Sequence, residues 1–370
     1  MPGPFEDSQS SLLSDIHLAL LRLSGRKPAS TSLEELTAGL AGKSVLVTGA
    51  GGFLGSALTE ALLAAAPARL TLVDNHENSL FWLRQRLAPC EQVGEARYVL
   101  ADVRDPEKVA QVLDESAPAV VFHLAAYKHV HLAEEYPGEF VRMNVLATWQ
   151  LCHEAIDRGV ERVVYPSSDK AVNNTGVYGA TKRTVELLLE ALAKDSAPTT
   201  FAAVRLVNVI GASGGVVQAF SRQIAAGGPA RVTHPEMTRY WINPQEALRL
   251  LTAAARLDGS GRIFLLEMGR PVKVLEIAQE LWRILRPQED FRFECIGMRQ
   301  GERLHEELLH DYEAAVATAI PEVLSVERRS GPDLDMADIT EHLARLERLM
   351  SGCSSAELKA ELLGFIQRAS

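Results

Sequence analysis

A glycine-rich turn between an apolar strand and a helix-forming segment most constrains the fold of this chain. The β-branched apolar run at 43–48 predicts a buried strand, and residues 56–66 favour a helix. Gly49, Gly52 and Gly55 allow a tight turn, a close approach of backbone N–H groups to a pyrophosphate, and close packing of the helix on the strand. A pyrophosphate there lies at the positive end of the helix dipole. The unit therefore predicts a dinucleotide site, with a ligand-free glycine turn as the alternative.

Strands and helices continue to alternate after this unit. Short apolar runs predict strands at 70–74, 97–103, 119–124, 161–166 and 201–207, and helical patterns occupy 79–88, 106–114, 138–158 and 178–194. This alternation predicts the α/β class, with a Rossmann-type doubly wound parallel sheet and a smaller C-terminal substrate-binding lobe. Ligands of such sheets bind at the carboxyl ends of the strands.

Residues at the predicted strand ends are the candidates for cofactor contacts. Asp74 ends the second strand, where a carboxylate accepts hydrogen bonds from the adenosine ribose, which favours NAD and leaves NADP as the alternative. We expect Asp102 to border the adenine pocket. The predicted contacts are Gly49, Gly52, Phe53, Leu54, Gly55, Asp74, Asn75, Asp102, Val103, Ala125, Ala126, Tyr127, Tyr178 and Lys182.

Two pairs of titratable residues follow the fifth predicted strand. Tyr178 and Lys182 are four residues apart, so on a helix they share one face. A tyrosine there can take a proton from a hydroxyl while a nicotinamide takes a hydride, and a nearby cation lowers the pKa of the phenol. Asp169 and Lys170 supply a further acid and base, which indicates chemistry beyond one hydride transfer. The alternative is a surface ion pair at the strand end.

The chain is long enough for one large core and a smaller lobe. We expect an N-terminal helical extension at 1–40, a dinucleotide-binding domain at 41–207 to which 241–267 returns, a substrate-binding lobe at 208–240 and 268–330, and a helical tail at 331–370. Residues 10–23 have an amphipathic helical pattern. We interpret this helix as an arm that faces another subunit or a membrane, or as a helix packed on its own domain.

Composition excludes several classes of protein. The net charge of −10 and the absence of a lysine- and arginine-rich block argue against nucleic-acid binding. No apolar run approaches the length of a membrane span, and the first residues lack the features of a signal peptide. Cys90, Cys152, Cys295 and Cys353 have no metal-type spacing. We therefore expect a cytoplasmic protein with reduced thiols and no metal site.

Several motifs together resemble a known family. They are Val47–Gly52, His123–Val130, Ser168–Val172, Tyr178–Arg183, Val232–Tyr240 and Gly301–Leu308. In this order they resemble the extended short-chain dehydrogenase/reductases of the bacterial polysaccharide-biosynthesis group. The closest type is the C5-inverting UDP-N-acetylglucosamine 4,6-dehydratase, and the resemblance extends from about residue 28 to about residue 325.

The resemblance implies a role for each residue of the two pairs. Tyr178, supported by Lys182, accepts the proton of the sugar 4-hydroxyl during oxidation at carbon 4. Lys170 then removes the proton of carbon 5, and Asp169 protonates the departing 6-hydroxyl. Ser168 hydrogen-bonds the ketone oxygen, and hydride returns to carbon 6.

The same resemblance implies a UDP-sugar substrate and a homo-oligomer. The implied substrate contacts are Lys128, His129, Asn208, Arg239, Arg299 and Glu302. Arginine suits a diphosphate because its guanidinium can bind bidentately. The alternative for these residues is an ordinary solvated surface charge.

Departures from the family pattern leave other functions open. Asn174, Gly176, His131 and Gln300 stand where the family has other residues, around the expected sugar and phosphate pockets. The expected function is a dehydratase acting on a UDP-N-acetylhexosamine. The alternatives are a nucleotide-sugar 4-epimerase or oxidoreductase, and a non-catalytic NAD(P)-binding protein, against which the intact Tyr178 and Lys182 argue.

Overall fold

The computed structural model describes most of the chain as two compact units. The described residues are 4–88, 96–195, 198–212, 214–299, 301–331, 334–352 and 354–369, so Cys90, Gln300 and Cys353 lie outside them. The sheet unit comprises 31–206, 248–266 and 307–370, and the lobe unit comprises 1–30, 207–247 and 267–306. Each unit is described by itself.

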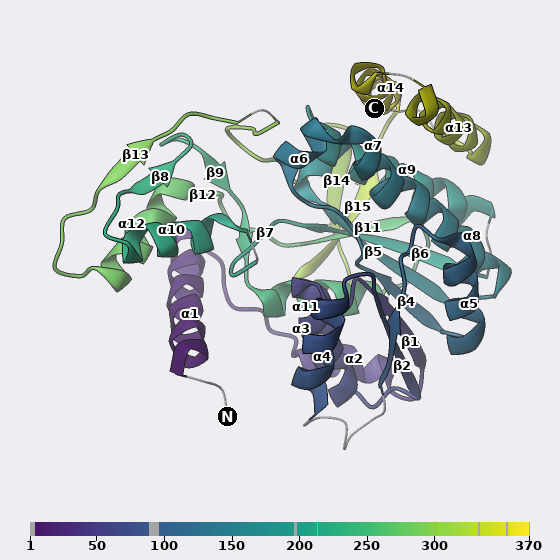
Figure 1. Cartoon of the computed structure of the whole chain (residues 1–370), viewed down its shortest axis with the longest axis horizontal. Helices are drawn as coiled ribbons and strands as arrows, with labels where there is room; N and C mark the ends of the chain where they lie inside the picture. Colours follow the sequence, from purple (N-terminus) through teal and green to yellow (C-terminus); the bar gives the residue numbers. More distant parts are fainter. Residues whose placement is uncertain are drawn as a thin grey trace. The chain divides into compact units, whose positions relative to one another are not determined.

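One large sheet forms the centre of the sheet unit (Figure 1). Its strands, in order across the sheet, are β14 (Glu313–Ala317), β15 (Val323–Arg328), β11 (Arg262–Leu266), β6 (Thr200–Leu206), β5 (Arg162–Ser168), β4 (Val120–His123), β1 (Ser44–Thr48), β2 (Arg69–Asp74) and β3 (Ala96–Leu100). All neighbouring pairs from β11 to β3 are parallel, whereas β15 and β14 are antiparallel to their neighbours. The order reverses between β1 and β4, and ligands of doubly wound sheets bind at such a point.

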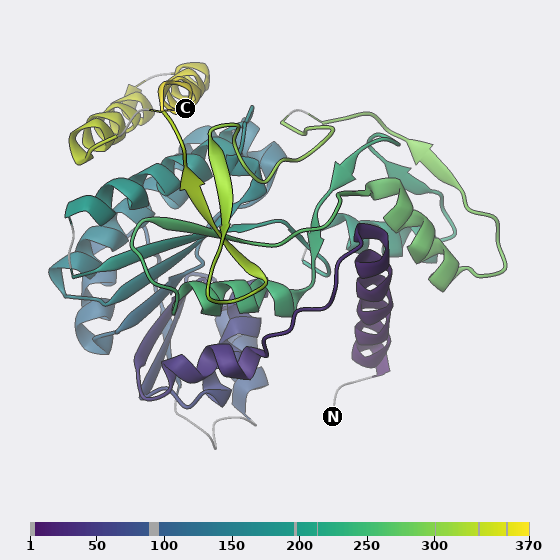
Figure 2. The same cartoon turned by 180° about the vertical axis from the view of Figure 1, so that it is seen from behind.

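Helices cover both faces of this sheet, as Figures 1 and 2 show. On one face lie α5 (Pro106–Ser116), α8 (Ala147–Asp157) and α9 (Val177–Asp195), and on the other lie α2 (Leu33–Thr37), α3 (Phe53–Ala64), α4 (Glu77–Leu87) and the end of α11 (Pro244–Ala254). The strands β4 and β5 are buried along their whole length and β6 is buried after its first residue, which explains their continuous apolar runs.

The connection between β4 and α8 is more broken than the sequence predicts. It contains α6 (Val130–Glu135), α7 (Pro137–Phe140) and a π-helical segment, η3 (Val141–Leu146), before α8. Pro137 begins a new helix because it lacks the N–H group that would continue the preceding one. The predicted helix at 138–158 is thus present as three segments.

Two C-terminal helices complete the sheet unit. They are α13 (Met336–Gly352) and α14 (Ser355–Arg368), which pack on α9. Leu362 of α14 and Leu346 of α13 are fully buried in the same apolar core as α9. The C-terminal tail is therefore part of this unit's core.

In the part of the chain that the structure describes, the lobe unit is built from short strands, three complete helices and the start of α11. Its elements are α1 (Pro4–Ser24), β7 (Asn208–Val209), α10 (Val216–Ala225), β8 (Ala230–Val232), β9 (Thr238–Arg239), β10 (Trp241–Ile242), β12 (Val272–Lys273), α12 (Val274–Leu285) and β13 (Phe293–Cys295). Ile16 and Leu20 of α1 are buried against α12 and its neighbours. The first helix therefore packs within the lobe unit.

The predicted α/β class with a doubly wound parallel sheet is confirmed. The unit boundaries differ from the predicted domain boundaries: 31–40 belong to the sheet unit, and 241–247 belong to the lobe unit instead of returning with 248–266 to the sheet unit. Residues 1–30 belong to the lobe unit, and 307–330 belong to the sheet unit because β14 and β15 extend the sheet. Within the described residues, no helix combines the length and the apolar character needed to cross a membrane.

Candidate active site

The glycine-rich segment from the end of β1 into α3 has no room for a Cβ atom at Gly49, Gly51 or Gly55. A Cβ atom on Gly55 would lie 2.1 Å from the carbonyl oxygen of Gly49. Gly49 has φ +66°, and a Cβ there would lie 2.7 Å from the backbone nitrogen of Ala125. Gly52 is the N-cap of α3 and has no side chain to occupy the first N–H groups of the helix. These groups are therefore positioned for a pyrophosphate, so the loop fits a dinucleotide.

Two carboxylates follow the neighbouring strands. Asp74 accepts hydrogen bonds from the backbone N–H groups of Gly51 and His76, each at 2.9 Å. Asp102 forms a bidentate pair with Arg104, whose hydrogen bonds lower the pKa of the Asp102 carboxyl to about 2. Hydrogen bonds thus fix both aspartate side chains at the carboxyl edge of the sheet.

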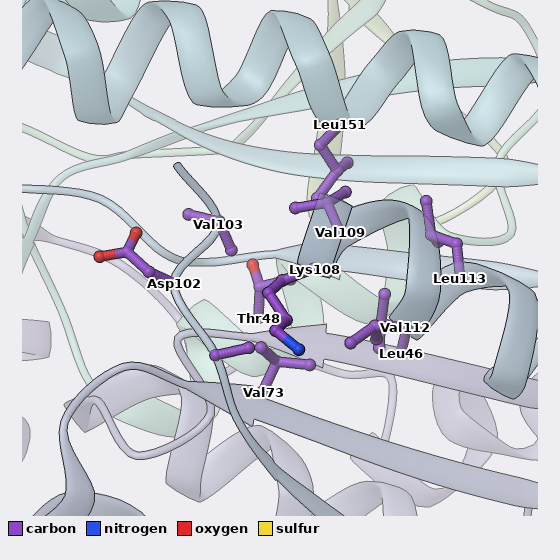
Figure 3. A pocket seen from close by; sticks show the side chains of 11 residues that line it. Leu46, Thr48, Val73, Asp102, Val103, Lys108, Val109, Val112, Leu113 and Leu151 are labelled. Carbon is purple, nitrogen blue, oxygen red and sulfur yellow. The ribbon is translucent and has the colours of Figure 1, made fainter. Parts of the chain in front are cut away.

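A small, largely apolar pocket lies beside Asp102 and Val103 (Figure 3). Its lining includes Val73 from β2, Val109 from α5 and Leu151 from α8. Figure 3 shows the Asp102 carboxylate at the edge of this apolar group. Two predicted cofactor contacts, Asp102 and Val103, therefore border this pocket.

The loop after β4 is clamped by a buried asparagine. Asn144, on η3, accepts the backbone N–H of Tyr127 at 2.8 Å and donates to its carbonyl at 3.0 Å. Asn144 also donates to Thr181 on α9, 3.2 Å away. The predicted contacts Ala125, Ala126 and Tyr127 thus lie on a segment tied to the helix that carries Tyr178 and Lys182.

Ser168, Asp169 and Lys170 lie together at the end of β5. Asp169 and Lys170 belong to a 3₁₀ turn, η4 (Asp169–Ala171). The Ser168 hydroxyl donates to Asp169 Oδ1 at 2.9 Å, and Lys170 Nζ lies 3.1 Å from the same oxygen. The Asp169 side chain is fully buried, whereas that of Lys170 is 29% exposed. The Asp169–Lys170 pair is therefore half-buried, which argues against the alternative of a surface ion pair.

Tyr178 is on the first turn of α9, next to this group. Burial raises the pKa of the Tyr178 phenol, while the Lys170 charge and a hydrogen bond with Ser168 act in the opposite direction. The sequence predicted that Lys182 lowers this pKa. In the structure the nearby lowering charge is that of Lys170, and burial has the larger effect.

Lys182 is held one turn further along α9. Its Nζ donates to the carbonyl of Pro166 at 2.8 Å and lies 4.4 Å from the centre of the Tyr165 ring. Burial lowers the pKa of Lys182 to about 7, and the charge of Glu186 partly opposes this. Tyr178 and Lys182 do share one helix face, as their spacing predicts.

Behind Lys182 lies a buried ionic network that sequence reasoning missed. Glu186 accepts hydrogen bonds from Ser167, Arg183 and Arg205, and Arg205 also pairs with Glu313 of β14. Burial alone would raise the pKa of Glu186, but the arginines lower it to about 2. The i+4 spacing from Lys182 could have identified Glu186. Its partners Arg205 and Glu313 become neighbours only through the sheet.

The six predicted substrate contacts are divided between the units. Lys128 and His129 are exposed in the sheet unit, directly before α6. In the lobe unit, Asn208 donates to Glu306 at 2.8 Å, and Arg239 Nε lies 3.0 Å from the same carboxylate. The structure thus brings Asn208 and Arg239 together on Glu306.

Arg239 is more buried than an arginine that binds a phosphate at the protein surface. It is 9% exposed, and its guanidinium donates to the backbone carbonyls of Thr238 and Arg303 at 2.8 Å. Arg299 is exposed, and its backbone N–H donates to the Glu302 carboxylate at 2.9 Å. Arg239 therefore fixes the segment before Glu306, and Arg299 is the freer cation of the two. Among the described residues, no cluster of three histidine, cysteine or acidic side chains could hold a metal ion.

Comparisons with known proteins agree with this geometry. The model of a family described as polysaccharide biosynthesis protein matches residues 45–328. Capsular polysaccharide biosynthesis protein CapD of Staphylococcus aureus is 40% identical over 295 residues, covering 79% of this chain and 49% of that protein. The chain therefore spans about half the length of this relative.

Two further proteins are similar over most of their own length. The inverting UDP-N-acetylglucosamine 4,6-dehydratase of Campylobacter jejuni is 30% identical over 269 residues, covering 71% of this chain and 76% of that protein. The crystal structure of Pen from Bacillus thuringiensis matches with a TM-score of 0.72 at 28% identity, covering 80% of this chain and 89% of that one.

Proposed function

Since the chain belongs to the polysaccharide biosynthesis protein family, a group of extended short-chain dehydrogenase/reductases, we propose that it is a C5-inverting nucleotide-sugar 4,6-dehydratase. The proposed substrate is a UDP-N-acetylhexosamine. The observation that carries the proposal is the half-buried Asp169–Lys170 pair on the turn beside Tyr178. A simple oxidoreductase or 4-epimerase needs the Tyr178 and Lys182 side chains but has no step for this second acid and base.

The dinucleotide would be held by the glycine loop, Asp74, Asp102 and the segment from Ala125 to Tyr127. When bound, a nicotinamide supplies a hydride acceptor for carbon 4 and a hydride donor for carbon 6. Tyr178, which is hydrogen-bonded with Ser168, takes the proton of the 4-hydroxyl. Lys182, fixed by the Pro166 carbonyl, lies one turn away as a donor for the cofactor ribose.

The Asp169–Lys170 pair performs the elimination. The ketone at carbon 4 acidifies the proton on carbon 5, which the neutral amine of Lys170 removes. The protonated carboxyl of Asp169 gives its proton to the 6-hydroxyl, so the C6–O bond breaks and water leaves. The ion pair in the structure is the state that this step produces. Transfer of one proton across the 3.1 Å contact gives the reactive neutral pair.

The end of the cycle restores the starting protonation. Lys170 returns its proton to carbon 5 on the opposite face after hydride reaches carbon 6. Tyr178 then holds one proton more than at the start, and Asp169 holds one fewer. Ser168 is hydrogen-bonded to both side chains and can pass the proton between them.

The test is turnover of UDP-N-acetylglucosamine in heavy water, followed by mass spectrometry and NMR. We expect loss of water and solvent deuterium at carbon 5. Asp169→Asn and Lys170→Ala should each reduce dehydration by roughly 10²–10⁴-fold, the usual contribution of a general acid or base.

A surface ion pair provides the matched control. Lys43 and Glu161 are 2.6 Å apart and about half exposed, so Lys43→Ala should leave the rate unchanged. A product of unchanged mass with inverted carbon 4 would instead show that the protein is an epimerase. Full dehydration by Asp169→Asn would show that Asp169 is not the general acid. The predicted homo-oligomer and cytoplasmic location stay predictions.

A further inference from the structure

A continuous chain of buried hydrogen bonds joins β1, β4 and α8 next to the loop after β4. Thr48 Oγ1, at the end of β1, lies 2.7 Å from His123 Nδ1, and His123 Nε2 lies 3.0 Å from Thr148 Oγ1 on α8. His123 and Thr148 are fully buried, and Thr48 is 2% exposed. None of the proposed catalytic steps uses these three side chains.

The donors and acceptors of this chain can be assigned in order. The single hydroxyl hydrogen of Thr148 is used in a 2.8 Å bond to the carbonyl of Asn144, one turn back on the helix. His123 must therefore donate to Thr148 through Nε2–H, and its Nδ1 accepts from the Thr48 hydroxyl. This neutral tautomer agrees with the surroundings, because burial and the charge of Lys182 lower the pKa of His123 to about 3.

Both ends of the chain hold the backbone of the loop from Ala125 to Tyr127. The Thr48 oxygen accepts the Ala125 N–H at 3.3 Å, and Asn144 binds the N–H and carbonyl of Tyr127. The loop also lies so close to Gly49 that a Cβ there would be 2.7 Å from the Ala125 nitrogen. A shift of this loop would therefore change the floor on which a dinucleotide binds.

We propose that His123, together with Thr48 and Thr148, is a positioning residue that fixes the Ala125–Tyr127 loop in its cofactor-binding position. The inference rests on the dinucleotide site of the proposed function, but not on the sugar chemistry. Without this chain of hydrogen bonds, the Ala125–Tyr127 loop spends a smaller fraction of time in its cofactor-binding position. The apparent affinity for the dinucleotide falls in proportion to that fraction.

The test is titration of the purified full chain with NAD⁺ and with NADP⁺ by calorimetry, without any sugar nucleotide. Thr148→Val keeps the side-chain shape but leaves the His123 Nε2–H without its acceptor. We expect the dissociation constant of the preferred dinucleotide to rise about tenfold, the effect of one buried hydrogen bond. Thr148→Ser restores the hydroxyl and should return the constant to within about twofold of the original.

Thr252→Val is the matched control, because Thr252 is also fully buried and also donates to the carbonyl four residues earlier, at 2.8 Å on α11. It should lower the melting temperature no more than Thr148→Val does, with the dissociation constant unchanged. Equal dissociation constants for the two valine variants would overturn the inference, and so would a failure of Thr148→Ser to restore binding.

The sugar reaction is scored separately. If the expected binding pattern appears but no nucleotide sugar loses water, the proposed function fails and the inference stands. If the unaltered protein binds neither dinucleotide, both are wrong.

Discussion

The carboxylate of Asp74 is held by two backbone N–H groups and is only 9% exposed. It therefore cannot turn away from a phosphate on the adenosine 2′-oxygen without breaking both bonds. We expect the chain to bind NAD more tightly than NADP, because the fixed negative charge repels that phosphate. Asp74→Asn should shift the ratio of the two dissociation constants toward NADP by at least about tenfold, which corresponds to ~1.4 kcal/mol.

Titration calorimetry with each dinucleotide measures this ratio. Asp335→Asn is a suitable control, because Asp335 also accepts a backbone N–H, that of Asp338 at 3.0 Å, on the surface at the start of α13. An Asp74→Asn variant whose ratio equals that of the control would show that Asp74 does not select the cofactor.

Single residues also show where sequence reasoning stops. The i, i+4 spacing of Tyr178 and Lys182 is sufficient to predict that they share a helix face. The pKa of Tyr178 is not predictable in this way, because it depends on burial and on the charge of Lys170, which lies on the turn η4 and not on the helix of Tyr178. The same holds for His123, whose partners Thr48 and Thr148 are 75 and 25 residues away in sequence.

At the scale of elements, the turn η4 and the first turn of α9 are in direct contact through Gly179. A Cβ on Gly179 would lie 2.0 Å from the carbonyl oxygen of Lys170 and 2.8 Å from the Cβ of Asn174. Gly179→Ala must therefore push the Asp169–Lys170 turn away from Tyr178. We expect a stability loss of about 1–3 kcal/mol, typical of overpacking, and a fall in dehydration of roughly tenfold or more.

Rate and denaturant unfolding of the Gly179→Ala variant can be compared with those of Gly352→Ala. Gly352 is also helical, and nothing lies within 4 Å of a Cβ built on it, so its replacement should change neither quantity appreciably. Normal dehydration by Gly179→Ala would mean that the close approach of the two elements has no part in catalysis.

Elements with a strong local signal are the ones that the sequence predicts. The strands β1 to β6 and the helices between them have continuous apolar runs or helical periodicity, and the structure contains them within a few residues of the predicted bounds. The strands β14 and β15 were not predicted, because β15 joins the sheet through β11, about 60 residues away in sequence, and β14 joins it only through β15. The π-helical segment before α8 depends on the clamp between Asn144 and Tyr127, which periodicity does not reveal.

At the scale of the whole molecule, the two units each contain segments that are distant in the sequence. Arg26, directly after α1, pairs with Glu246 and donates to the Trp241 carbonyl at 2.7 Å within the lobe unit. The amphipathic pattern of residues 10–23 predicts that this helix packs against an apolar surface, but it does not predict which surface. The alternative in which this helix packs on its own unit is the arrangement found.

Three buried histidines in the sheet unit make its stability depend on acid. Burial lowers the pKa of His123 to about 3 and the pKa values of His310 and His342 to about 4, against about 6.5 in an unfolded chain. Between these values the unfolded state binds protons that the folded state does not. The free energy of unfolding therefore falls as the pH decreases below about 6.5, and rises again with pH.

Each such histidine contributes up to about 1.4 kcal/mol per pH unit in this window. His342, stacked on Phe365 and facing Glu361, Arg345 and Arg368, can be replaced away from the proposed active site. Urea unfolding at pH 7.0, 6.0 and 5.0 should show that the free energy of unfolding of His342→Gln falls less steeply with decreasing pH than that of the unaltered protein. Near pH 5.0 the difference in slope should approach about 1.4 kcal/mol per pH unit, which corresponds to one proton. The exposed His131→Gln should follow the unaltered protein. Parallel lines for His342→Gln and the unaltered protein would mean that folding does not keep His342 neutral, because the unfolded chain would then gain no proton relative to the folded one.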